Sequence, residues 1–81
     1  MVTKTLKCKV TSSNIQEVSF VYNPNTNDKL GSLTVEFKSG LTYVYSQVPL
    51  EVVEQVISAE SVGKAFNELI KKGGYKFQRI H

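Results

Sequence analysis

The sequence predicts an α+β fold, in which an antiparallel four-stranded sheet, a meander, is followed by two C-terminal helices packed on one face of the sheet. Apolar and polar residues alternate through four segments between residues 2 and 46, a pattern typical of strands with one buried face. After Pro49 the apolar spacing becomes that of amphipathic helices. Because 81 residues suffice for one core and not for two, we expect a single domain over residues 1–81.

Composition excludes several classes of protein. Hydrophobic residues make up 41% and charged residues 21%, the balance of a globular chain. No apolar run approaches the ~20 residues of a membrane helix, and no basic start precedes an apolar stretch, so we expect a cytoplasmic protein. One cysteine and one histidine provide neither a disulfide nor a metal site, and we expect no metal and no cofactor. The net charge of +3 weakly favours anionic partners.

A polar break separates the first two predicted strands. The strand over residues 2–10 has an apolar side made of Val2, Leu6, Cys8 and Val10. Residues 12–14 interrupt this pattern, and the second strand directs Val18, Phe20 and Tyr22 inward. Residues 23–29 collect Asn, Pro and Asp, which predicts a hairpin loop before the third strand.

The turn at residues 38–40 decides where the tyrosines of the fourth strand point, because a one-residue slip sends every side chain to the other face. A two-residue loop would place Val35 opposite Val44 and turn Tyr43 and Tyr45 outward. A three-residue loop, with Gly40 in the left-handed conformation, would place Val35 opposite Tyr43.

We favour the three-residue loop, since the shorter loop would bury polar residues. The favoured register puts Leu33 opposite Tyr45 and makes one continuous apolar face. It leaves four polar residues on the outer face of the sheet: Thr34, Glu36, Thr42 and Ser46.

Two helices and a short tail complete the predicted fold. Pro49 suits the first turn of a helix whose apolar stripe comprises Val52, Val53, Val56 and Ile57. A second helix is expected from Ser61 to Lys72, ended by Gly73 and Gly74, with a stripe of Val62, Ala65, Phe66, Leu69 and Ile70. The tail over residues 75–80 alternates and could add a short edge strand.

The start of the second helix is a candidate anion site. Its first backbone N–H groups could hold a phosphate, Gly63 would allow a close approach, and Lys64 would add charge. The competing interpretation is that Ser61 is an ordinary N-cap and Gly63 a packing contact. The Ser-x-x-Lys spacing also occurs in serine acyl enzymes, but this short chain lacks room for their other catalytic elements.

Five of the ten basic side chains lie in the last 18 residues: Lys64, Lys71, Lys72, Lys76 and Arg79. Such a cluster could follow a phosphate backbone in a sequence-independent and salt-sensitive manner. A solvated face is the competing interpretation, because Glu68 lies four residues from both Lys64 and Lys72 and could form helical ion pairs. Tyr43 and Tyr45 could stack on unpaired bases, but the favoured register turns them toward the helices and predicts core residues.

An ordered set of residues resembles the KTSC domain family, named after the C-terminal region of some lysyl-tRNA synthetases. The set comprises Ser12, Ser13, Ile15, Phe20, Tyr43, Tyr45, Val48, Pro49, Ala59, Ser61, Gly63, Phe66, Asn67, Ile70, Tyr75 and Arg79. The resemblance covers residues 12–79 and leaves the strand over residues 2–10 as an addition. It implies a sheet followed by helices, with RNA as the conjectured ligand. The first hairpin is longer than expected for the family, and Ala65 stands where an aromatic residue often precedes Phe66.

Two functions compete. The first is a small non-enzymatic nucleic-acid-binding module, for RNA, that contacts backbone phosphates through Ser61, Gly63, Lys64, Lys71, Lys72, Lys76 and Arg79. The second is a protein-interaction module, such as a small regulator or inhibitor from a phage or other mobile element, that uses an edge strand or the outer face of the sheet. An enzymatic function is placed last, because the sequence pairs no nucleophile with a base and offers no metal set.

Overall fold

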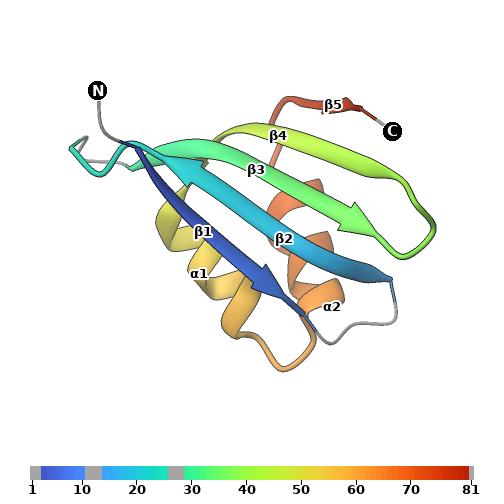
Figure 1. The fold of residues 1–81 in the computed structure, drawn as a ribbon. Helices are drawn as coiled ribbons and strands as arrows, with labels where there is room; N and C mark the ends of the chain where they lie inside the picture. The colour runs from blue at the N-terminus through green and yellow to red at the C-terminus, as the bar shows by residue number, and fades with distance from the viewer. Residues whose placement is uncertain (1–2, 11–13, 26–28, 81) are drawn as a thin grey trace.

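The computed structural model describes residues 3–10, 14–25 and 29–80. Its elements are β1 (Lys4–Lys9), β2 (Ile15–Tyr22), β3 (Leu30–Phe37), β4 (Thr42–Pro49), α1 (Leu50–Ser58), α2 (Val62–Phe66), a π-helical segment η1 (Asn67–Lys71) and β5 (Phe77–Arg79). The strands form one antiparallel sheet in the order β1-β2-β3-β4-β5, and the helices lie on one face of it (Figure 1). The predicted α+β class, the meander and the C-terminal edge strand are confirmed. Predictions that involve Val2, Ser12 and Ser13 lie outside the described residues.

The β3–β4 turn adopts the favoured register. Val35 pairs with Tyr43 and Leu33 pairs with Tyr45, as the three-residue loop requires. Gly40 has a φ of 96°, which a residue with a side chain rarely adopts, and its N–H donates to the carbonyl oxygen of Phe37 at 3.0 Å. The tyrosines therefore point toward the helices, and Tyr45 is 3% exposed.

Thr42 lies on the outer face of the sheet, as the favoured register predicts, although only 9% of it is exposed. Its backbone pairs with Glu36 of β3 on one side, and on the other its carbonyl oxygen accepts a hydrogen bond from the N–H of Ile80. The tail that follows β5 thus shields a position that would be solvated at the edge of a four-stranded sheet.

A bulge in β2 was not predicted. Ile15 pairs with Phe37, but Glu17 pairs with Glu36, so Gln16 is an extra residue in this strand. The bulge breaks the period of two and buries both Ile15 and Val18, which are three residues apart. It also bends the start of β2 beside the β3–β4 turn, where the N–H of Lys38 donates to the carbonyl oxygen of Asn14 at 2.8 Å.

One core fills the space between the sheet and the helices. It consists of Ile15, Val18, Phe20, Leu33, Val35, Tyr45, Val48, Val53, Val56, Val62, Phe66 and Ile70. Pro49 departs from its predicted place in the first helical turn: with ψ at 144° it is extended, ends β4 and caps α1 without a side-chain hydrogen bond. The buried Val53 and Val56 of α1 confirm the predicted apolar stripe.

The second helix changes its winding midway. It is α-helical only from Val62 to Phe66 and continues as a π-helix to Lys71, whereas the sequence predicted one regular helix to Lys72. The i→i+5 bonds of a π-helix place residues five apart on nearly the same side, so Lys71 follows Phe66 toward the sheet. Within the described residues, Glu68 forms no ion pair with Lys64 or Lys72.

Candidate nucleic-acid interface

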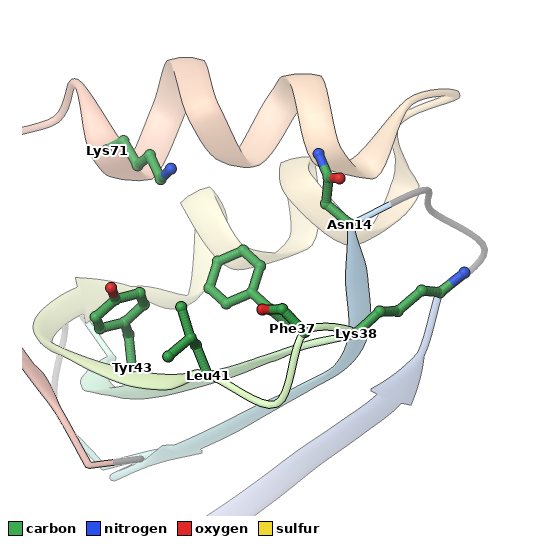
Figure 2. Close-up of a pocket in the computed structure, with 7 residues that line it drawn as sticks. Asn14, Phe37, Lys38, Leu41, Tyr43 and Lys71 are labelled. Atoms are coloured by element: carbon green, nitrogen blue, oxygen red, sulfur yellow. The ribbon is translucent and has the colours of Figure 1, made fainter.

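A groove lies between the end of the β3–β4 hairpin and the second helix. Its largest hollow has a volume of about 590 Å³ and is lined by Asn14, Phe37, Lys38, Ser39, Leu41, Tyr43 and Lys71. In Figure 2, Phe37 and Tyr43 rise from the sheet toward the helix that carries Lys71, while Lys38 extends away from the Phe37 ring. The walls of this hollow therefore come from three segments that are far apart in the sequence.

Two smaller hollows continue this groove on either side of Lys71. One, of about 350 Å³, adds residues of the second helix, among them Gly63, Lys64 and Asn67. The other, of about 330 Å³, is lined by Tyr43, Tyr45, Lys71 and Phe77. Because Lys71 lines all three hollows, we treat them together as the Lys71 groove.

Aromatic rings form the floor of the Lys71 groove. The centroids of Phe37 and Tyr43 lie 5.7 Å apart and those of Tyr43 and Phe77 lie 5.9 Å apart, both edge to face. The Nζ atom of Lys71 lies 6.0 Å from the centroid of Phe37. Such a contact contributes only about 0.5–1 kcal/mol at an exposed site, so Lys71 can leave the ring when a stronger anionic partner is present.

The charge along the Lys71 groove has one sign. Lys38, Lys64 and Lys71 line it, and among the described residues that line it none is acidic. Acidic side chains lie elsewhere: Glu17 and Glu36 pair across β2 and β3 on the face away from the helices, where Glu17 also contacts Lys7 at 3.3 Å. The groove is therefore chemically suited to an anion that carries a flat apolar group.

The structure brings together some of the predicted site residues and separates others. Gly63, Lys64 and Lys71 line the groove. Arg79 pairs with Tyr43, which places it on the same face of the sheet, beside the groove. Lys72 and Lys76 line none of its three hollows. Whether any of these residues binds a ligand stays a prediction.

Ser61 has the structural role of an N-cap. Its Oγ atom accepts a hydrogen bond from the backbone N–H of Lys64 at 3.4 Å, and its carbonyl oxygen accepts one from the N–H of Ala65. The cap uses one N–H group of the helix start, that of Lys64, which the predicted anion site could also have used. The Lys64 side chain at this end of the helix is exposed.

Sequence reasoning missed Phe37 and Phe77 as site residues. Phe37 is half-buried at the end of β3, where the core opens into the groove. Phe77 was placed only as an alternating tail residue, and it is 63% exposed. The available signal was that each carries an aromatic ring at the end or the edge of the predicted sheet.

Alkaline pH should report on the tyrosines under the groove. Burial raises the pKa of Tyr45 above its ordinary value of 10.0, and the neighbouring Tyr43 raises this pKa further. The folded protein thus holds this proton more tightly than the unfolded chain, so this stabilising effect is complete below pH 10 and is lost as pH rises through the folded-state pKa. We expect the free energy of unfolding to fall less steeply above pH 10 in Tyr45→Phe. Urea unfolding at several alkaline pH values measures this, and parallel declines in both proteins would contradict it.

The described residues hold neither a metal-binding cluster nor a helix that could span a membrane. No group of three or more His, Cys, Asp and Glu side chains within residues 3–10, 14–25 and 29–80 is placed to hold a metal ion. In the same residues no helix is long and apolar enough to cross a membrane.

Fold and groove together define a class: a small α+β domain whose helix-covered antiparallel sheet carries a basic, aromatic groove at one end. The model of the KTSC domain family matches residues 11–75. The chain belongs to the KTSC domain family.

Relatives and a solved structure agree with this assignment. The chain is 46% identical over 48 residues to an uncharacterized protein from Stutzerimonas stutzeri, covering 59% of this chain and 68% of that protein. It is 39% identical over 64 residues to a lysine–tRNA ligase from Nostoc punctiforme, covering 79% of this chain but only 11% of the ligase. The crystal structure of a KTSC domain protein from Yersinia pestis superimposes with a TM-score of 0.69 at 30% identity, covering 96% of this chain and all of that one.

Proposed function

We propose that this KTSC domain is a non-enzymatic module that binds RNA through its backbone phosphates. The observation that carries the proposal is the Lys71 groove, which is lined by three lysines, while none of the described lining residues is acidic. An ammonium group is a compact charge that suits a phosphate oxygen. The relatives named lysine–tRNA ligases support RNA as the class of ligand, since a homologous segment is part of proteins that by name act on tRNA.

The affinity should be modest and salt-dependent. Each phosphate contact to a single strand changes the logarithm of the binding constant by about 0.7 per tenfold change in salt. Lys64, Lys71 and Arg79 offer only a few such contacts. We propose the cytoplasm as the location of this domain, because RNA is present there.

Fluorescence anisotropy with a labelled RNA oligonucleotide tests the proposal. The variant Lys64→Ala/Lys71→Ala removes two charges from the groove, and Lys72→Ala/Lys76→Ala removes two charges outside it. We expect the groove variant to bind about tenfold more weakly at low salt and to lose about 1.4 from the salt slope, while the matched variant changes both much less. No binding by wild type at low salt, or equal losses in the two variants, would overturn the proposal.

A protein-interaction module is the second proposed function, and β1 supports it. This strand is the edge of the sheet, so its outer backbone groups can pair with a strand of a partner. Its lysines at positions 4, 7 and 9 oppose such pairing with a second copy and favour an acidic partner strand. A pull-down from nuclease-treated lysate that recovers one partner, and fails with Lys7→Glu/Lys9→Glu, would favour this function over RNA binding.

A further inference from the structure

The side chain of Phe77 lies outside the core, although it is one of the largest apolar side chains of this domain. It is 63% exposed, more than any other exposed large hydrophobic residue among those described. It lies in β5, a strand of three residues whose every residue is exposed. Exposure of this extent leaves one face of an aromatic ring in water, which costs free energy unless a ligand covers it.

The neighbours of Phe77 hold its ring in a fixed place. Its centroid lies 5.9 Å from that of Tyr43 and 5.4 Å from that of Tyr45, and Tyr45 is buried in the core. With Phe37 on the far side of Tyr43, three rings lie in a row along the groove floor: Phe37, Tyr43 and Phe77. Single-strand binders stack bases on aromatic side chains such as these, because every base presents a π-face. The planes of neighbouring rings in this row are inclined by 78° and 87°, so a base can stack on only one ring at a time.

Lys71 lies over the Phe37 end of this row, with its Nζ atom 6.0 Å from the centroid of that ring. It lines the hollow over Phe37 and Tyr43 and also the hollow over Tyr43, Tyr45 and Phe77. A ligand that placed one flat ring in each of these hollows would pass its connecting segment beneath the Lys71 ammonium. A dinucleotide step has this form, with two bases joined by a phosphate.

The dimensions and the chemistry of the groove select against a duplex. Hollows of about 590 and 330 Å³ accommodate small planar groups, whereas the bases of a duplex have their faces covered by stacking. Asn67, exposed at the adjoining hollow, has an amide that can both donate to and accept from the edge of an unpaired base.

We propose that the Lys71 groove binds single-stranded RNA by holding two successive unpaired bases, one stacked on Phe77 and one in the hollow over Phe37 and Tyr43, with the phosphate between them on Lys71. This inference rests on the proposed function and deepens it. Phosphate contacts alone would bind duplex and single strand alike, whereas stacking requires bases whose faces are free.

A tryptophan at position 77 tests the stacking directly, because the chain contains no tryptophan of its own. In Phe77→Trp, a single-stranded RNA hexamer should quench the emission of this one indole. A duplex of the same sequence and an abasic ribose–phosphate hexamer with the same charge should leave the emission nearly unchanged. Equal quenching by all three would overturn the inference.

Binding measurements separate this inference from the function on which it rests. We expect Phe77→Ala to bind the RNA hexamer at least about fivefold more weakly, with its salt slope unchanged, since stacking is worth about 1–3 kcal/mol per base. The matched variant Ile80→Ala removes an exposed side chain, 50% accessible, from a residue opposite Thr42 on the other face of the sheet, and it should bind as wild type does.

The outcomes of these measurements distinguish the stacking inference from the phosphate-binding function. If wild type binds the hexamer, the duplex and the abasic strand equally and Phe77→Ala binds like wild type, the phosphate function stands and the stacking inference is wrong. If wild type binds none of them at low salt, both are wrong. Circular dichroism of Phe77→Ala and Phe77→Trp confirms that the fold is intact, as expected for a residue this exposed.

Discussion

Replacing Phe66 with alanine should leave much of the protein unfolded at room temperature. Phe66 is 2% exposed, and its ring meets those of Phe37 and Tyr45 edge to face at 5.8 and 5.5 Å. Truncation of a buried phenylalanine costs about 3–5 kcal/mol through lost burial and the cavity left behind. A domain of 81 residues has a total stability of only about 4–12 kcal/mol. Thermal and urea unfolding by circular dichroism measure the loss.

The variant Phe77→Ala is the matched control for Phe66→Ala. It removes the same side chain, but from a position that is 63% exposed, so we expect a loss below about 1 kcal/mol. Comparable losses in the two variants would contradict the assignment of Phe66 to the core and of Phe77 to the groove surface. The pair also separates roles, since Phe66 stabilises the floor of the groove from below whereas Phe77 presents its ring to solvent.

Local rules predicted those parts of the fold that depend on neighbours in sequence. The direction of Tyr43 and Tyr45 followed from a three-residue turn that only Gly40 makes inexpensive, and the structure confirms it. The predictions were wrong where tertiary packing overrides the regular spacing of residues in a strand or helix. The bulge at Gln16 and the π-helical turns from residue 67 to 71 each insert one residue into a regular pattern, and no composition signal marks them.

The charged part of the candidate site was predictable from the sequence, whereas Tyr43, which lines the groove, was considered for stacking and then assigned to the core. Lys64 and Lys71 were named from the sequence because basic residues cluster near them. The rings beneath them come from β3, β4 and β5, so their meeting depends on sheet order and not on spacing in sequence. Lys71 reaches the rings through the π-helical winding, a feature that a regular helical wheel cannot represent.

Replacing Gly31 with alanine should have the second large effect on stability. A Cβ atom at this position would overlap the carbonyl oxygen of Val21 and lie 2.8 and 2.9 Å from the Cβ and Cα atoms of Tyr22. These are mainly backbone atoms of β2, the strand with which β3 pairs, so no rotation of a side chain relieves the overlap. The strands would have to separate where Gly31 also pairs with Val48 of β4, and we expect a loss of about 3 kcal/mol or more.

Gly40→Ala separates this steric effect from the general cost of replacing a glycine. Gly40 has a φ of 96°, but a Cβ atom there would meet no heavy atom within 4 Å, so only the backbone conformation is penalised, by about 1–2 kcal/mol. Urea unfolding of both variants under the same conditions measures the difference. If Gly31→Ala proved no more costly than Gly40→Ala, the close approach of β2 and β3 at Gly31 would be wrong. If it is more costly, as expected, Gly31 is required because two paired strands leave no room for a side chain.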